Sequence, residues 1–557
     1  MTSPAPLCWR RHRAGQARAC GAAQPLVLTA MAVALLMLFP VLGVLAHLVT
    51  GQSAEVLRHL LNTVLLEATL TSLGLGLLVT LGAMLVGTGA AWLVTRYDFP
   101  GRRWLTWALM LPLAMPAYVA AYAYTDWLQF SGPVQSTLRS AFGWGPREYW
   151  FPEIRSVPGA AALFISVLYP YVYALARPAF IERSPHLVDA ARTLGCSPRA
   201  VFWRVALPLA RPAMIAGGML ALMETLSDYG AVAYFGLPTF TQSLYNAWFN
   251  LGDRGAAAQL AAALLLTVAV VVFIERRSRG ARRFATTAAH GGAERVTLQG
   301  GAAWRATALC ALPLIAGFVL PAWLLVRLHL QLEEAPRWGA YFDWLQHSVT
   351  AGALSAVLAV TLALLIAYAG RLQPRPHVRF ANALAGLGYA LPGSVIAVGV
   401  LVPLARLDNT VDAWMRTHFD ISTGLLLTGS LAALVYAYLV RYLAVAYHGI
   451  DAGLSRITPS MDLSARSLGA TPGETLVRVH APLLSRSALA AAVLVFVDTV
   501  KELPATLVLR PFNFDTLAVV AHNFAKDERL AEAALPALTI VAVGLLPALL
   551  LSKTTDR

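Results

Sequence analysis

The sequence predicts an all-α polytopic membrane protein with about 12 transmembrane helices in two parallel six-helix repeats. Composition is the first reason: 58% of the residues are hydrophobic and only 13% are charged, whereas soluble domains carry about a quarter charged residues. The mean hydropathy of +0.61 agrees with this. In addition, apolar runs long enough to cross a bilayer recur along the whole chain, and a polar segment near residue 185 recurs near residue 459.

The apolar runs reach the length of a bilayer crossing, about 17–25 residues, and fall into two groups of six. They are predicted at 26–48, 66–95, 104–125, 158–180, 212–235 and 256–274, and then at 306–328, 348–370, 380–404, 421–446, 486–508 and 531–551. These groups define a first half, 26–274, and a second half, 306–551, joined by a linker at 275–305. Short tails at 1–25 and 552–557 complete the predicted organisation.

Arginine placement predicts the orientation of the chain. The net charge is +14, and the arginines gather in the N-terminal tail and in every second connection, such as "RYDFPGRR" at 96–103. Because basic connections stay in the cytoplasm, both termini are expected there. Arginines distributed between apolar runs in this way fit a membrane topology, so nucleic acid is not an expected partner and membrane lipid is.

An internal repeat links the two halves. The segment "PHLVDAARTLGCSPRAVFWRVALPL" at 185–209, here named the first loop, matches "PSMDLSARSLGATPGETLVRVHAPL" at 459–483, the second loop, at an offset of 459 − 185 = 274. A weaker match pairs the surroundings of Pro116 and Pro392, at 392 − 116 = 276. With six spans per half, both loops are expected in the cytoplasm, which makes the halves parallel rather than inverted repeats.

Each loop has the residues of two short helices joined by a turn. Gly195 and Gly469 are placed to end the first helix, because glycine adopts the left-handed conformation at little cost. Pro208 and Pro482 are expected to end the second helix before the next span begins. The sequence therefore predicts a helix–turn–helix beneath the membrane, made twice.

The second helix of each loop has a recognisable start. Ser197-Pro198 and Thr471-Pro472 each place a hydroxyl at the N-cap and a proline at the first helical position. Glu474 adds a capping box to Thr471.

The small and basic residues of the loops predict a docking surface for another protein, because small residues permit close approach and arginines reach carboxylates. The candidate residues are Asp189, Ala190, Ala191, Arg192, Gly195, Arg204 and Pro208 in the first loop, and Ser464, Ala465, Arg466, Gly469, Arg478 and Pro482 in the second. The alternative is a basic loop lying on anionic lipid, which explains the arginines but not the repeated glycine and prolines.

The two loops resemble the EAA loops of ABC importer permeases, whose pattern is Glu-Ala-Ala, three residues, Gly and a later Leu-Pro. The first loop has Asp-Ala-Ala at 189–191, and the second has Leu-Ser-Ala at 463–465. Leu463 departs from the pattern, although Asp462 stands one position earlier, so the second contact is expected to be weaker or reorganised. The resemblance implies the type I importer permease fold, with each loop fitting a cleft in an ATP-hydrolysing subunit.

A second pair of motifs narrows the resemblance. The segments "METLSDYGAVAYFGLPTFTQSLYNAWF" at 223–249 and "KELPATLVLRPFNFDTLA" at 501–518 are similar to the fused two-half permeases of ferric-iron importers. This implies a bacterial inner-membrane subunit that moves ferric iron delivered by an extracytoplasmic binding protein, driven by two separate ATPase subunits. Permeases for thiamine, polyamine, sulfate or phosphonate are the alternatives. An ion-coupled secondary transporter is an alternative of another class, which the duplicated loops disfavour.

Charged residues inside the predicted spans form a second group of candidates: Glu224, Asp228, Asp498, Lys501 and Glu502. A charge near the bilayer centre costs about 2.5–3.5 kcal/mol on insertion scales. Asp498 lies one helical turn before Lys501, and a pair between them is expected to leave Glu502 as a net negative charge. At the repeat offset, Glu224 aligns with Asp498 and Asp228 with Glu502. These residues either line a cation-accepting translocation path or fix the packing of helices, and the sequence leaves both interpretations open.

No enzymatic activity is expected of the chain itself. It contains no Gly-Lys pair and hence no phosphate-binding Gly-x-x-x-x-Gly-Lys-Ser/Thr stretch. ATP with Mg²⁺ is therefore expected on the partner subunits, with no cofactor on this chain. No catalytic residues and no metal site are predicted, because no nucleophile pairs with a base and no ligand spacing occurs.

Overall fold

The computed structural model describes residues 7–49, 58–59, 62–146, 148–183, 190–191, 193–279, 295–332 and 335–555. In these ranges almost all regular structure is helical, and the two strands are 2 residues long each. Of the described helices, 11 are long and apolar enough to cross a membrane, or 12 if the bent pair Arg102–Ala114 and Ala117–Phe142 forms one span. The prediction of an all-α protein with about 12 transmembrane helices is therefore confirmed.

The chain divides into two compact units that cut across the sequence halves. The first-half unit joins His47–Leu345 to Asp515–Arg557, and the second-half unit joins Met1–Ala46 to Gln346–Phe514. The predicted halves are the two copies of the sequence repeat, whereas the units are the groups of helices that pack together. The first helix packs within the second-half unit, and the opening and closing helices of the second half pack within the first-half unit.

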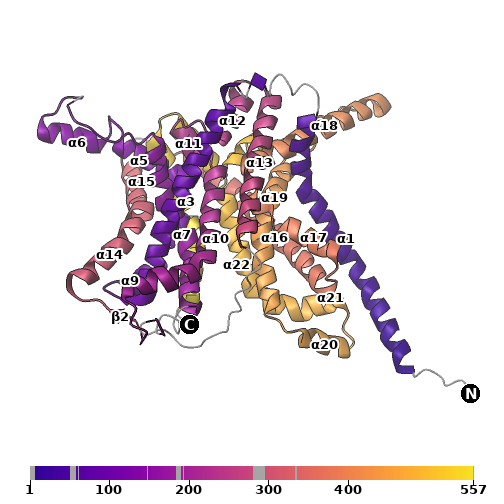
Figure 1. Ribbon diagram of the computed structural model, residues 1–557. Coiled ribbons are helices and arrows are strands. Elements are labelled where there is room, and N and C mark those ends of the chain that lie inside the picture. The colour runs from indigo at the N-terminus through magenta and orange to yellow at the C-terminus, as the bar shows by residue number, and fades with distance from the viewer. Residues whose placement is uncertain are drawn as a thin grey trace, which may run out of the picture. The chain divides into compact units, whose positions relative to one another are not determined.

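The first-half unit contains α3 (Leu65–Arg96), β1 (Tyr97–Asp98), α4 (Arg102–Ala108), η1 (Leu111–Ala114), α5 (Ala117–Leu128), α6 (Pro133–Phe142), α7 (Val157–Arg183), α9 (Pro198–Val201), η2 (Phe202–Ala206), α10 (Leu207–Ser227), α11 (Gly230–Tyr234), α12 (Phe240–Tyr245), η3 (Asn246–Asn250), α13 (Arg254–Arg279), β2 (Val296–Thr297), α14 (Gly300–Leu314), η4 (Ile315–Val319), α15 (Leu320–Leu330), α24 (Leu517–Lys526) and α25 (Leu530–Thr555). Helices α3, α7 and α10 pack against one another (Figure 1). Strands β1 and β2 pair in parallel, which ties the end of α3 to the start of the chain that follows the linker.

The second-half unit contains α1 (Leu7–Val49), most of α16 (Trp338–Leu372), α17 (Pro376–Ala385), η5 (Gly388–Ala390), α18 (Gly393–Phe419), α19 (Leu431–Ser455), α20 (Pro459–Ser467), α21 (Pro472–Thr475), η6 (Leu476–His480), α22 (Ala481–Val500) and α23 (Pro504–Leu509). Its core centres on α19, which packs against α18, α22 and α23 and contributes buried side chains such as Leu434, Tyr438 and Leu443.

The repeat extends from the sequence into the helices. Helix α7 begins at Val157 and α19 at Leu431, which is 431 − 157 = 274 residues later. Both η2 and η6 are π-helical turns of 5 residues, and they begin at Phe202 and Leu476, again 476 − 202 = 274 residues apart. Because two chain segments of different sequence fold alike at one constant offset, the halves are repeats of one structural unit with the same order of helices.

The prolines at the ends of the loops do not end a helix, which corrects the prediction for Pro208 and Pro482. Each lies in the first turn of a span, α10 or α22, directly after a π turn. A π turn hydrogen-bonds one residue further along than an α turn, so it accommodates a proline that lacks an N–H group. The loop therefore continues into the membrane as one helix, over Pro198–Ser227 (30 residues) and Pro472–Val500 (29 residues).

Several predicted spans are shifted because proline breaks and apolar loops were read as continuous helix. The predicted spans 104–125 and 380–404 straddle the breaks at Pro116 and Pro392, each the N-cap of the helix that follows. The break at Pro116 bends the chain by 91°. The weak repeat around these two prolines thus marks a helix start that both halves share.

The predicted span 421–446 begins too early, because α19 starts only at Leu431. The preceding apolar segment is a loop whose N–H groups are satisfied by carboxylates: Asp408 accepts from Thr428 N at 2.7 Å, and Asp412 accepts from Thr423 N at 2.7 Å. The predicted spans 212–235 and 486–508 end too late, because α10 ends at Ser227 and α22 at Val500, and a short helix follows each.

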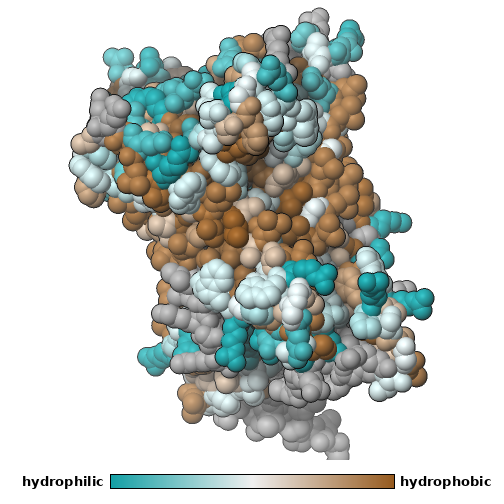
Figure 2. All heavy atoms as spheres, turned by 90° about the vertical axis from the view of Figure 1, so that its left-hand side faces the viewer, coloured by the Kyte–Doolittle hydropathy of each residue, from teal (hydrophilic) through white to brown (hydrophobic). Residues whose placement is uncertain are grey.

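Apolar side chains cover the outer surface of the spans. On the face that Figure 2 shows, hydrophobic residues form a broad band between two more hydrophilic ends. Along α14 to α15 the exposed large apolar residues are Trp304, Leu309, Leu312, Ile315, Val319, Trp323, Val326 and Leu330. Because soluble proteins rarely expose apolar surface of this extent, lipid is its natural solvent.

Helix α1 is held in the second-half unit by a close glycine contact with α18. A Cβ atom at Gly43 would lie 2.6 Å from the carbonyl oxygen of Gly399, and one at Gly399 would lie 2.2 Å from that of Pro40. Tyr436 of α19 also donates a hydrogen bond to the carbonyl of Leu36. Small residues at such crossings let two helix backbones approach.

We therefore expect Gly43→Leu to destabilise the protein by about 1–3 kcal/mol, the range for overpacked sites. The measurement is the thermal unfolding midpoint in detergent or nanodiscs. Gly74→Leu is the matched control, because nothing lies within 4 Å of a Cβ atom there. Equal midpoints for the two variants would contradict the contact.

Candidate functional site: the loops and the charges at the far ends of their helices

The second loop folds as predicted up to its turn. Helix α20 spans Pro459–Ser467, and Gly469 follows with a φ of +85°. The N–H of Ala470 donates to the carbonyl of Ala465 at 3.0 Å, and the N–H of Leu468 to that of Ser464 at 3.1 Å. These bonds satisfy carbonyls at the end of the helix, and the left-handed glycine makes the turn possible.

The second helix of this loop starts at a complete capping box. The Thr471 hydroxyl accepts from Glu474 N at 3.3 Å, and the Glu474 carboxylate accepts from Thr471 N at 2.8 Å. Pro472 occupies the first position of α21. The predicted cap is thus confirmed, and two otherwise orphaned N–H groups are satisfied.

The first loop repeats these features wherever it is described. Gly195 has a φ of +83°, and the N–H of Cys196 donates to the carbonyl of Ala191 at 3.0 Å. The Ser197 hydroxyl accepts from Ala200 N at 3.3 Å. Two candidate residues, Asp189 and Arg192, lie outside the described residues.

The small residues of the loops do not all face outward. Ala191 and Ala465 are both 8% exposed, so they pack inside the fold of their own loop. This corrects the expectation that they let another protein approach closely. The exposed candidates are Ala190, Gly195, Arg204 and Pro208 in the first loop, and Ser464, Arg466, Gly469, Arg478 and Pro482 in the second.

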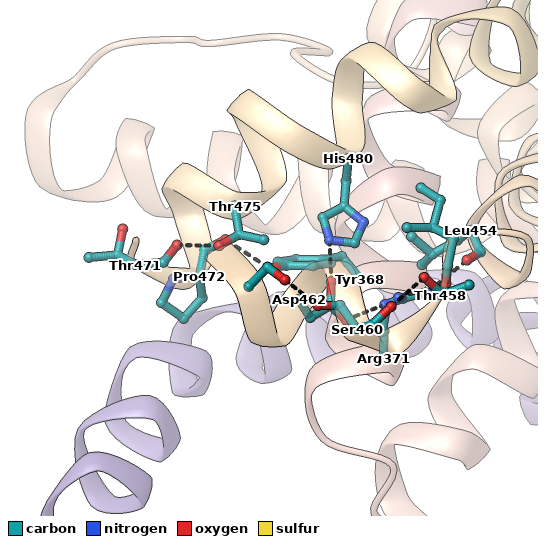
Figure 3. A network of polar contacts seen from close by, with 12 residues as sticks. Tyr368, Arg371, Leu454, Thr458, Ser460, Asp462, Thr471, Pro472, Thr475 and His480 are labelled. Carbon is teal, nitrogen blue, oxygen red and sulfur yellow. Dashed lines mark hydrogen bonds and ion pairs between the residues drawn. The ribbon is translucent and has the colours of Figure 1, made fainter. Parts of the chain in front are cut away.

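A network of polar contacts fastens the second loop to its unit (Figure 3). Asp462 of α20 accepts from Arg371 Nε at 2.8 Å through one carboxylate oxygen and lies 2.7 Å from His480 Nε2 through the other. Arg371 also donates to the carbonyls of Leu454 and Ile457, at 2.7 and 2.8 Å. Asp462 thus joins the end of α16 to the π turn before α22, while Arg371 holds the end of α19.

Tyr368 completes this network from α16. Its hydroxyl donates to the carbonyl of Pro472 at 2.8 Å, and its ring lies against that of His480 with centroids 5.3 Å apart. His480 is fully buried. The loop is therefore positioned by specific contacts at both of its helices, α20 and α21.

The intramembrane charges of the second-half unit form two ion pairs. Lys501 Nζ lies 2.8 Å from Asp498 Oδ1, which is the predicted pair. Glu502 is paired as well, because Arg441 Nη1 lies 3.2 Å from its Oε1. The expectation that Glu502 is left as a net negative charge is therefore wrong, since Arg441 of α19 supplies its counter-charge.

Glu502 also caps α23. Its carboxylate accepts from the N–H groups of Ala505 and Thr506, at 2.9 and 3.0 Å, and from the Thr506 hydroxyl at 2.7 Å. At 3% exposure it is buried. A Cβ atom at Gly393, the first residue of α18, would lie 2.7 Å from its Oε1. Glu502 therefore follows α22, bonds to α19 and α23, and lies against the start of α18.

Asp228 has the same place in the first-half unit. It accepts from the N–H groups of Ala231 and Val232, at 2.9 and 3.3 Å, in the first turn of α11. Glu224 lies half-buried one turn earlier in α10. Each unit thus has a loop at one end of a long helix and a capping acid at the other. These caps favour the packing interpretation for Asp228 and Glu502, and the lining of a translocation path stays a prediction.

No cluster of three or more His, Cys, Asp or Glu side chains able to hold a metal ion occurs among the residues that the structure describes.

Known proteins are similar to this chain in sequence. The profile of the family described as "Binding-protein-dependent transport system inner membrane component" matches residues 83–278. A molybdenum transport system permease protein of Escherichia coli is 30% identical over 223 residues, which cover 39% of this chain and 94% of that protein. The chain belongs to this family of inner membrane components. The permease is accordingly a multi-pass inner membrane protein, and the predicted importer class is confirmed.

Two further relatives match different shares of the permease. An Fe(3+)-transport system permease protein of Haemophilus influenzae is 27% identical over 486 residues, 85% of this chain and 87% of that protein. A sulfate transport system permease protein of Synechocystis is 31% identical over 206 residues, 34% of this chain and 70% of that protein.

Sequence reasoning missed three polar residues of the permease, Arg371, Arg441 and His480. A signal existed for Arg441, because it is an arginine inside a predicted span and the rule that singled out Lys501 applies to it equally. Arg371 and His480 gave no such signal. They lie 91 and 18 residues from Asp462 in the chain, and only the packing of α16, α20 and α22 brings them together.

We expect Thr471→Ala to destabilise the second loop by about 1 kcal/mol, the usual loss for an N-cap hydroxyl. Hydrogen exchange of the 471–480 amides, followed by mass spectrometry, measures this locally. Ser197→Ala is the matched substitution in the first loop and is expected to act on that loop alone. Unchanged exchange in both variants would contradict the caps.

Proposed function

We propose that this permease is the transmembrane subunit of an ATP-driven importer of ferric iron. The observation that carries the proposal is the extent of similarity to the Haemophilus influenzae iron permease, which spans 85% of this chain. The molybdenum and sulfate relatives match only 39% and 34% of this chain. Each of these two matches is too short to include both halves in full. A fused, two-half architecture is thus shared with the iron permease.

Two ATPase subunits are the proposed motor, one for each loop, with Mg²⁺ and ATP bound on them. This rests on the duplicated loops and on the missing phosphate-binding motif in the printed sequence. The arginine clusters favour cytoplasmic loops and cytoplasmic termini. An extracytoplasmic binding protein then delivers the cargo from the opposite side.

The continuous helices Pro198–Ser227, which ends in α10, and Pro472–Val500, which ends in α22, supply the mechanical link. Each runs without a break from the second helix of a loop to the capping acid, over 30 and 29 residues respectively, a distance of about 45 Å at 1.5 Å per residue. When the ATPase subunits close, the loops move, and each helix carries the movement to Asp228 or Glu502. The short helices α11 and α23, which these acids cap, then change position and open or close the path.

The acids near these breaks suit a cation as cargo. In the second-half unit Asp498 and Glu502 are paired with Lys501 and Arg441. At the repeat offset, Glu224 stands in place of Asp498 and Asp228 in place of Glu502, so both halves have acids at these positions. The proposed path residues are accordingly Glu224, Asp228, Asp498, Lys501 and Glu502.

Uptake of radiolabelled ferric iron into proteoliposomes tests the proposal. The vesicles contain the permease with its ATPase subunits, and the binding protein is added outside. We expect uptake that requires ATP and is not reduced by excess molybdate, sulfate, thiamine or polyamine. Transport of molybdate or sulfate in place of iron would support the oxyanion alternative, which the 30–31% identical relatives favour.

The purified permease alone is expected to hydrolyse no ATP, because it lacks a nucleotide site. A phosphate-release assay before and after addition of the ATPase subunits measures this. Hydrolysis by the permease without partners would contradict the division of roles.

A further inference from the structure

Two neighbouring residues of the second loop, Asp462 and Leu463, point in opposite directions. Leu463 aligns with Asp189 of the first loop and points outward, with 61% of its surface exposed. Asp462 points inward, and 23% of its side chain is exposed. The acid of the second loop is thus turned away from the surface that a partner would reach.

Inside the loop, Asp462 has two oriented contacts on different helices. Arg371 lies in the last turn of α16, and His480 is the last residue of the π turn η6, which continues into α22. Asp462 thus connects α20 to both of these helices. Both distances, 2.8 and 2.7 Å, are in the range of charge-assisted hydrogen bonds, which are stronger than neutral ones. Figure 3 shows the carboxylate lying between the two side chains.

The first loop has different residue types at the positions of Asp462 and His480. At the repeat offset, Val188 stands in place of Asp462 and Ala206 in place of His480. Neither side chain forms hydrogen bonds. The acid and the histidine that meet in the second loop thus have no counterparts of the same residue type in the first loop.

We propose that Asp462 is a positioning residue that clamps α20, the first helix of the second loop, to α16 and to the helix that continues into α22, so that movement of α20 reaches both spans. In this role Asp462 does not contact the ATPase subunit, and the partner meets Leu463 at this position instead. The role of the clamp in transport rests on the proposed function, whereas the clamp itself consists only of contacts within the chain. A rigid connection of this kind transmits a displacement, whereas a loosened loop moves without its spans.

The test uses the complete transporter in nanodiscs and the variant Asp462→Asn. Three quantities are measured: the affinity of the ATPase subunits for the permease, the rate of ATP hydrolysis, and the cargo moved per ATP. We expect affinity within twofold of the natural protein and cargo per ATP at least fivefold lower. Asp451→Asn is the control, because Asp451 is an exposed acid of α19, and it should leave all three unchanged.

Other outcomes overturn the proposal. A tenfold loss of affinity with unchanged cargo per ATP would make Asp462 a docking residue. If the yield of folded protein, the ATP hydrolysis and the transport all fell by the same factor, cargo per ATP would be unchanged. Asp462 would then have only a structural role. Asp462→Glu keeps the charge and is expected to recover part of the coupling.

A double-mutant cycle tests the clamp without any transport assay. Thermal midpoints are compared for Arg371→Gln, Asp462→Asn and the double variant. If the residues act as one clamp, the double variant melts close to the more destabilised single variant, whereas additive shifts would overturn the contact. Should the natural complex itself show no ATP-driven uptake, the proposed function fails while this cycle still decides whether the clamp exists.

Discussion

Replacing Glu502 with glutamine is expected to remove most of the folded permease rather than to spare folding and block transport. The carboxylate accepts from Arg441, from the N–H groups of Ala505 and Thr506, and from the Thr506 hydroxyl. A glutamine has only one acceptor oxygen, so its NH₂ group would face donors. It would also leave Arg441 as a buried cation without its counter-charge.

Breaking a buried pair from one side costs about 3–5 kcal/mol, a large fraction of the roughly 5–15 kcal/mol that stabilises a typical protein. The yield of monodisperse protein and its thermal midpoint measure the loss. Arg441→Met is expected to act similarly, because it leaves Glu502 unpaired. The double variant Arg441→Met/Glu502→Gln should recover part of the loss, since no buried charge remains.

Asp498→Asn is the comparison within the same unit. Its partner Lys501 is 26% exposed and Asp498 itself 17%, so solvent screens this pair more than the Glu502 pair, and a smaller shift is expected. A Glu502→Gln permease that folds normally and melts at the natural temperature, yet moves no cargo, would contradict the structural role. It would instead place Glu502 on the translocation path.

The loops were predictable because their signals are local. A glycine that ends a helix, a hydroxyl that caps the next one and a proline at its first position act within a few residues. The repeat supports the prediction a second time, since Gly195 and Gly469 occupy matching positions and predict the same turn. The prediction of a cap at Thr471 with Glu474 needed no knowledge of the rest of the chain.

What the sequence could not predict depends on contacts between distant segments. Asp462 was noticed only as a displaced acid, because its partner Arg371 lies 91 residues earlier. The start of α19 was placed too early because the loop before it is apolar, and its N–H groups are satisfied by Asp408 and Asp412 from α18. Hydropathy registers the apolar residues but not the distant carboxylates that make a loop possible there.

Replacing Gly469 with valine is expected to uncouple ATP hydrolysis from transport while leaving membrane insertion intact. At a φ of +85° an L side chain is strained, at a cost of about 1–2 kcal/mol. A Cβ atom there would have nothing within 4 Å, so the cost comes from the backbone and not from a clash. The chain would relieve it by changing the turn, which breaks the bond from Ala470 N to the carbonyl of Ala465. Helix α20, and Asp462 with it, would then shift relative to Arg371 and His480.

Substitutions of graded strain separate this effect from a general intolerance of the loop. Asparagine tolerates the left-handed region, so Gly469→Asn should retain most of the coupling, Gly469→Ala less and Gly469→Val least. Gly473 lies one turn further on, in α21, with equally open space and without a positive φ, and Gly473→Ala should be neutral. Cargo moved per ATP, measured in the reconstituted complex, gives the order. If Gly473→Ala were as harmful as Gly469→Val, or if Gly469→Val transported normally, the left-handed turn would not be what holds the loop in its coupling geometry.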